Sequence, residues 1–107
     1  MSRIDVHAHL YSDAYLRDLE RVFVNPSTPR DRLSYGQLHR KVRANPAMWT
    51  VDERLELMDR LEVDCQVLSL SLPQVYVGDA ELRQRLARIS NDHFADTIAR
   101  HPGKFLA

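Results

Sequence analysis

Strand-type and helix-type hydrophobic patterns alternate along this 107-residue chain, and this alternation is the strongest constraint on its fold. Period-two segments predict strands, and apolar residues at three- and four-residue spacing predict helices. In chain order we expect a strand at 3–9, a helix at about 13–23, a helix at about 51–61, a strand at 64–70, a helix at 79–100 and the start of a strand at 104–107. Strands that alternate with helices imply an α/β fold with a parallel sheet and right-handed crossovers.

Residues suited to helix ends support these boundaries. Ser12 or Asp13 can cap the first helix, because short polar side chains accept hydrogen bonds from free backbone N–H groups. Thr50 and Glu53 have the spacing of a capping box at the start of the second helix. Asp79 is in position to cap the last helix.

The segment 24–48 breaks the pattern. Prolines, Gly36 and many basic residues interrupt it, and we expect a long excursion that holds a short hairpin near 33–43. A connection this long within a compact domain is usually functional or disordered.

Composition excludes several classes of protein. Fifteen basic residues balance fifteen acidic ones, so the chain lacks the basic excess of a nucleic-acid binder. Apolar runs of only two or three residues are too short for a membrane span. The N-terminal residues do not resemble a secretory signal. Cys65 is the single cysteine, which excludes an internal disulfide. We therefore expect a cytoplasmic protein that contacts neither nucleic acid nor membrane.

The pair His7 and His9 is the main candidate for chemistry. In a regular strand both side chains point to one face together with Asp5, about 6.5–7 Å apart at Cα. Two imidazoles at this spacing can reach one metal ion at about 2.0–2.1 Å each. The pair stands at the C-terminal end of the strand, where parallel barrels place their active sites. A His-x-His pair also occurs by chance on exposed strands, where it has no function.

Several segments together resemble the amidohydrolase superfamily, in its branch that includes aminocarboxymuconate-semialdehyde decarboxylase. The resemblance covers nearly the whole chain. The matching segments are Ile4-Asp5-Val6-His7-Ala8-His9-Leu10, Trp49 to Leu55, Met58-Asp59, Cys65 to Ser69, Asn91-Asp92 and His101-Pro102-Gly103-Lys104-Phe105. One position departs from the family pattern, since Glu62-Val63 stands where relatives often carry glycine before the second strand.

The resemblance implies the N-terminal portion of a TIM-like (β/α)8 barrel. Residues 1–107 would then form a single incomplete domain, with two βα units, the start of strand three and the 24–48 excursion over the barrel mouth. It implies that His7 and His9 bind a divalent metal, usually Zn²⁺. It also implies hydrolysis or non-oxidative decarboxylation of a carboxylated or ring small molecule. The remaining ligands would lie in later strands, so the 107 residues are expected to be inactive alone.

An arginine in the excursion is the candidate for substrate binding. The decarboxylase branch uses an arginine here to hold a substrate carboxylate, which the resemblance assigns to Arg40, or to Arg43 if the alignment gap lies elsewhere. The planar guanidinium suits this task because it can bind a carboxylate through two hydrogen bonds. A solvated basic loop is the alternative interpretation of the same residues.

Other side chains are assigned to packing or support. We expect Asp5 to support the metal site by hydrogen bonding, and Cys65, His93 and Trp49 to pack. For Trp49 the alternative is a place in the lining of the pocket. Ser69 and Ser71 lie at the end of the second strand, within reach of a substrate. The alternative function is a non-catalytic α/β module with incidental histidines. A homodimer is one assembly open to the full-length protein.

Overall fold

The computed structural model describes residues 2–24 and 29–107, with side chains described for 2–22 and 36–107. Its parallel three-stranded sheet has the order β1 (Ile4–His9), β2 (Cys65–Ser69) and β3 (Phe105–Leu106). The helices are α1 (Asp13–Val24), α2 (Pro29–Arg43), the 3-10 helix η1 (Pro46–Met48), α3 (Val51–Arg60) and α4 (Ala80–Arg100). The predicted alternation of strands and helices and the parallel sheet are confirmed.

Two of the three predicted helix caps form. The Ser12 hydroxyl accepts the Tyr15 N–H at 3.0 Å, and the Asp79 carboxylate accepts the Leu82 N–H at 2.8 Å. Thr50 occupies the N-cap position of α3, but its side chain makes no capping hydrogen bond. The predicted capping box is therefore wrong in its hydrogen bonding, although the helix begins where expected.

The hairpin expected near 33–43 is wrong, because α2 occupies that segment. Pro29 stands at the first helical position, where its missing N–H costs no hydrogen bond. Three basic residues lie in the last turn, where positive charge complements the helix dipole. Val42 is buried and Leu38, four residues earlier, is partly buried against the same cluster. This contact stabilises a helix that Gly36 and a mostly polar sequence otherwise weaken.

The sheet is covered by α3 and α4 through one hydrophobic cluster, named here the sheet cluster. Met58 of α3 and Phe94 of α4 pack in one cluster with Leu68 of β2, and all three side chains are buried. The cluster consists of Ala8, Leu10, Met58, Leu68, Phe94 and Phe105.

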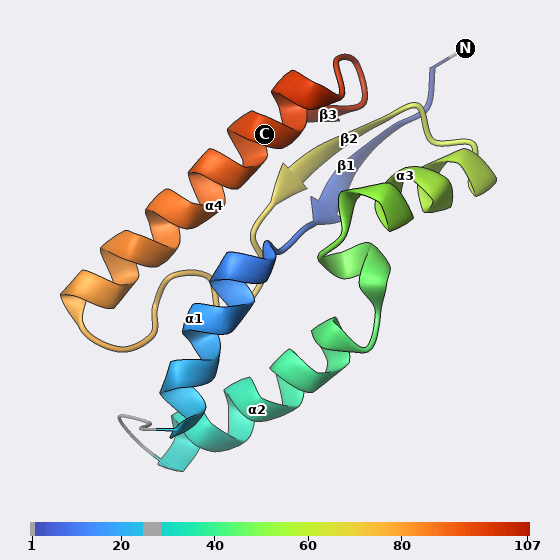
Figure 1. Ribbon diagram of the computed structural model, residues 1–107. Coiled ribbons are helices and arrows are strands. Elements are labelled where there is room, and N and C mark those ends of the chain that lie inside the picture. The colour runs from blue at the N-terminus through green and yellow to red at the C-terminus, as the bar shows by residue number, and fades with distance from the viewer. Residues whose placement is uncertain (1, 25–28) are drawn as a thin grey trace.

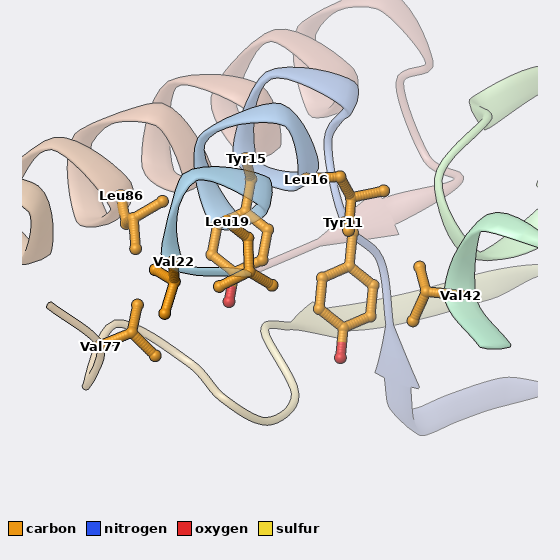
Figure 2. Close-up of a cluster of buried hydrophobic side chains, with 8 residues drawn as sticks. All are labelled: Tyr11, Tyr15, Leu16, Leu19, Val22, Val42, Val77 and Leu86. Atoms are coloured by element: carbon orange, nitrogen blue, oxygen red, sulfur yellow. The ribbon is translucent and has the colours of Figure 1, made fainter. Parts of the chain in front are cut away.

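A second cluster packs around α1 (Figure 2). We name it the hairpin cluster after the helical hairpin formed by α1 and α2. It consists of Tyr11, Tyr15, Leu16, Leu19, Val22, Val42, Val77 and Leu86. Tyr11 precedes α1, and the other members come from α1, α2, the loop 70–79 and α4. Half of the members lie in α1, which is therefore the centre of this half of the molecule.

The α1–α2 pair lies beyond the C-terminal ends of β1 and β2, whereas α3 and α4 flank the strands (Figure 1). The molecule is consequently elongated, with extents of 48 × 24 × 19 Å and a radius of gyration of 14.6 Å, above the roughly 13 Å of a compact chain of this length. Within the described part of the chain, no helix is long and apolar enough to cross a membrane.

A bulge in β1 changes the faces that simple alternation predicts. Asp5 pairs with Gln66 and Ala8 pairs with Leu68, so two residues of β1 lie opposite one residue of β2. Gln66 and Leu68 share the face covered by α3 and α4, and the bulge therefore places Asp5 on that face together with Ala8.

The expectation that Asp5 shares a face with both histidines is wrong for this reason. His9 pairs with Ser69 on the opposite face of the sheet. Ile4 and Val6, which alternation assigns to a buried apolar face, are 57% and 76% exposed.

Candidate metal-binding site

The two strand histidines converge on one point. The Nε2 atoms of His7 and His9 lie 3.0 Å apart, and their rings meet edge to face with centroids 4.8 Å apart. Two nitrogen ligands of one ion, each at about 2.0–2.1 Å, are separated by roughly 2.9–3.3 Å in octahedral to tetrahedral geometry. The donor set and its spacing therefore fit a shared divalent ion.

Ser69 orients the ring of His9. The His9 Nδ1 atom lies 2.9 Å from the Ser69 hydroxyl, and that hydroxyl faces the Ala8 carbonyl at 3.5 Å. If Ser69 donates to Ala8, it accepts the Nδ1–H of His9, which leaves the Nε2 lone pair free for a metal. Metal-binding histidines usually fix their tautomer through such a bond on the second ring nitrogen. Ser69, predicted to lie at the strand end, thus contacts His9.

The two histidines are an incomplete ligand set. Among the residues that the structure describes, no group of three or more His, Cys, Asp or Glu side chains could hold a metal ion. Catalytic zinc sites usually have three protein ligands.

A buried network lies behind the histidines, and it includes a residue that sequence reasoning missed. Arg54 of α3 is 5% exposed and donates hydrogen bonds to the carbonyls of His9 and Ala47 and to Oε1 of Gln66. Gln66 donates to Asp5 Oδ2 at 3.1 Å, and Asp5 Oδ1 accepts the His7 N–H at 3.0 Å. Asp5 thus hydrogen-bonds to the strand segment that carries the histidines, as expected, and its support of a metal site stays a prediction.

Electrostatics agree with this connectivity. Burial lowers the pKa of the Arg54 guanidinium from its ordinary value, and the negative charge of Asp5 opposes that shift. Arginine nevertheless remains protonated in proteins, so a positive charge is buried beside the strand end. A sequence signal existed, because Arg54 precedes the buried Met58 by one helical turn and so lies on the buried side of α3.

The two candidate arginines of α2 have different surroundings. Arg40 is exposed in the last turn. Arg43 is paired with Asp13 at 2.6 Å and with Glu20 at 3.5 Å, and its guanidinium lies 4.8 Å from the Trp49 ring centroid. The Arg43 guanidinium also holds the pKa of the Asp13 carboxyl below its ordinary value. Arg43 thus fastens α2 to α1, while Arg40 is the more accessible of the two.

Comparison with known proteins identifies the family. The chain matches no protein-family model. It is 33% identical over 92 residues to a gamma-resorcylate decarboxylase of Rhizobium radiobacter. The matched region covers 83% of this chain and 28% of that protein. The solved 5-carboxyvanillate decarboxylase of Sphingomonas paucimobilis superposes with a TM-score of 0.78 at 33% identity, covering 97% of this chain and 32% of that one. The chain is a relative of the amidohydrolase-superfamily decarboxylases.

These decarboxylases also define the fold. A 5-carboxyvanillate decarboxylase of Novosphingobium aromaticivorans, solved with manganese and 4-hydroxy-3-methoxy-5-nitrobenzoic acid, superposes with a TM-score of 0.79 at 19% identity, covering 97% of this chain and 32% of that one. The chain therefore spans about a third of the length of the decarboxylases it matches. The expected fold class, a portion of a TIM-like barrel, is confirmed.

Three other side chains considered from the sequence are partly buried. Cys65 is half-buried at the opposite end of β2, where it pairs with Ile4. His93 is half-buried in α4, and burial lowers the pKa of its imidazole, as expected of a packing residue. Trp49 is partly buried against the hairpin cluster, and its indole N–H donates to the Arg43 carbonyl at 3.3 Å, which fits the packing role.

Proposed function

We propose that this chain forms the first part of the active site of a metal-dependent, non-oxidative decarboxylase that acts on aromatic carboxylic acids. The observation that carries the proposal is the convergence of the His7 and His9 Nε2 atoms, 3.0 Å apart, at the C-terminal end of β1. The kinship with decarboxylases of hydroxylated benzoic acids supports decarboxylation over hydrolysis.

In this proposal His7 and His9 hold one divalent ion. Bound there, the ion would supply Lewis-acid polarisation of substrate oxygen atoms. The sequence resemblance implies zinc, whereas the fold relative from Novosphingobium aromaticivorans contains manganese. Metal analysis of protein purified without added metal would distinguish the two ions.

Arg40 is proposed to bind the substrate carboxylate. Its exposed side chain belongs to the α1–α2 pair, which lies beyond the strand ends that carry the histidines (Figure 1). The engagement of Arg43 with Asp13 and Glu20 favours Arg40 for this role. In the overall reaction the bond between ring and carboxyl carbon breaks, CO₂ leaves and the ring carbon gains a proton.

The remaining ligands and the proton donor are proposed to come from residues outside this chain, in a full-length barrel. The 107 residues alone should therefore bind metal weakly and give no turnover. A cytoplasmic location is also proposed, which the single free cysteine supports. Light scattering on the full-length protein would test whether it is a homodimer.

Replacing His7 and His9 together by alanine tests the proposal in the full-length protein. We expect the wild type to contain about one tightly held divalent ion per chain, measured by mass spectrometry of the metal content. The double variant should lose both the ion and the release of CO₂ from 2,6-dihydroxybenzoate or 5-carboxyvanillate.

His101→Ala is the matched control, because His101 lies at the far end of α4. It should retain metal and activity. Stoichiometric metal and turnover in the double variant would refute the proposal and favour a module with incidental histidines.

A further inference from the structure

Arg54 is a buried cation in a position where packing alone would favour an apolar residue. Met58, one turn later on α3, is 1% exposed in the sheet cluster, and an apolar residue at position 54 would extend the same buried stripe. Burying a guanidinium costs free energy unless its donors are satisfied. Arg54 meets this condition through three oxygen acceptors on three different elements.

These partners connect Arg54 to the backbone of both histidines. One Nη2 bond reaches the His9 carbonyl directly. The other route runs from Nη1 to Gln66 at 3.0 Å, from Gln66 to Asp5 at 3.1 Å, and from Asp5 to the His7 N–H at 3.0 Å. The third bond, from Nε to the Ala47 carbonyl at 2.8 Å, attaches the segment before α3.

The second route ends inside the β1 bulge. Because two residues of β1 lie opposite one residue of β2, the ladder is interrupted there. The Asp5 carboxylate accepts the His7 N–H at this interruption. The bulge also places the Asp5 side chain beside Gln66 on the helix-covered face, so one carboxylate contacts both Gln66 and the His7 N–H.

The bulge in turn determines how the histidines are presented. In regular alternation Asp5 would accompany His7 and His9 on one face. Here Asp5 is on the buried face, whereas the two Nε2 atoms converge on the open side of the sheet. Bulges frequently re-aim side chains next to active sites.

We propose that Arg54, acting through Gln66 and Asp5, is a positioning residue that fixes the bulge in β1 and so holds His7 and His9 ready for one divalent ion. The proposal rests on the proposed metal site and deepens it. Arg54 touches neither metal nor substrate, and its effect passes through the backbone of β1.

The test compares three methionine substitutions in the full-length protein, stripped of metal with a chelator. Arg54→Met removes the guanidinium and all of its hydrogen bonds. Gln66→Met removes the amide that connects Arg54 to Asp5. Arg60→Met is the matched control, since Arg60 is an exposed arginine on the same helix. Mn²⁺ affinity is measured by electron paramagnetic resonance titration, and folding by a circular dichroism melt without metal.

We expect Arg54→Met and Gln66→Met to weaken Mn²⁺ binding by about 10- to 100-fold, the effect typical of residues that orient metal ligands. Arg60→Met should stay within about twofold of wild type. The visible spectrum of bound Co²⁺ should change in both network variants, which a uniform loss of stability would not cause. If Arg54→Met does not fold, the neutral Gln66→Met decides.

Folded network variants with wild-type Mn²⁺ affinity and an unchanged Co²⁺ spectrum would overturn the proposal. The double alanine variant of His7 and His9 separates this failure from a wrong metal site. Loss of metal in that variant, together with normal binding in Gln66→Met, would reject only the positioning role. Retention of metal in the double variant would reject both.

Discussion

The strand end that carries the histidines and the α1–α2 pair beyond it are stabilised in different ways. Behind the histidines a buried network of Arg54, Gln66 and Asp5 crosses three elements. The α1–α2 pair is instead held by the hairpin cluster and by partly exposed ion pairs, such as Arg43 with Asp13, whose side chains are 23% and 46% exposed. Exposed pairs contribute little, typically about 0–1 kcal/mol.

This difference separates two tasks of the proposed active site. Metal ligands must be held within narrow limits, and rigid strands with satisfied buried hydrogen bonds provide this. A substrate-binding arginine on a separately packed helix can change its position without moving the metal ligands. Substitutions in the two regions should therefore affect different properties of the full-length protein.

The largest effects are expected from substitutions that create a cavity in one of the two hydrophobic clusters, and they test whether the two regions are independent. Met58→Ala in the sheet cluster and Leu19→Ala in the hairpin cluster should each lower the free energy of unfolding by about 2–5 kcal/mol, because both side chains are at most 1% exposed. Urea denaturation measures the loss, with each variant serving as control for the other.

Their functional effects should diverge. Met58→Ala should also weaken Mn²⁺ binding, because Met58 packs beneath the sheet. Leu19→Ala should raise KM and leave metal affinity unchanged. Equal effects of both variants on metal affinity would show that the two regions are not independent.

Arg40→Lys should leave stability unchanged and lower kcat/KM by about 10- to 100-fold, because lysine retains the charge but loses the paired hydrogen bonds of the guanidinium. Steady-state kinetics with 2,6-dihydroxybenzoate measure the effect. Arg43→Lys is the control, and it should reduce stability by less than about 1 kcal/mol with little change in kcat/KM. The reverse result would transfer the carboxylate-binding role to Arg43.

A smaller effect is expected in the pH dependence of stability, which His93 influences. Burial lowers the pKa of His93 below its ordinary 6.5, so the unfolded chain binds a proton before the folded chain does. The contribution of His93 to stability is therefore complete above pH 6.5 and is lost as pH falls toward the folded-state pKa.

His93→Leu should make the melting temperature less dependent on pH between 7.5 and 5.5. The comparison with wild type isolates the contribution of position 93. An unchanged pH dependence in His93→Leu would contradict the assignment of His93 as a buried neutral residue.

The smallest effect is expected at the turn between α3 and β2. Glu62 has a φ of 56°, a left-handed conformation that glycine adopts without strain. Glu62→Gly should raise the free energy of unfolding by about 0.5 kcal/mol, because relief of strain exceeds the greater chain entropy of glycine and the loss of an exposed ion pair with Arg3. Thermal melts measure the gain, and destabilisation would show that the turn is not strained.

The same turn shows how much the sequence could reveal. The sequence resemblance implies a glycine at Glu62-Val63, and the Glu62 backbone adopts a conformation that glycine favours. The α2 helix was missed because its apolar pair, Leu38 and Val42, becomes informative only when α1 is packed beside it. Read from the sequence alone, the proline, glycine and basic residues of this segment predict a loop more strongly than Leu38 and Val42 predict a helix.

The sequence by itself determined the order of most elements, the parallel sheet and the placement of His7 and His9 at a strand end. These features follow from hydrophobic periodicity and helix caps, which depend on neighbours a few residues apart. Tertiary structure alone decided the face on which Asp5 lies and the role of Arg54. Both depend on contacts between distant segments, with Gln66 61 residues after Asp5 and Arg54 45 residues after His9. A bulge shifts the phase of a strand by one residue, and its position is stabilised by partners that local periodicity does not contain.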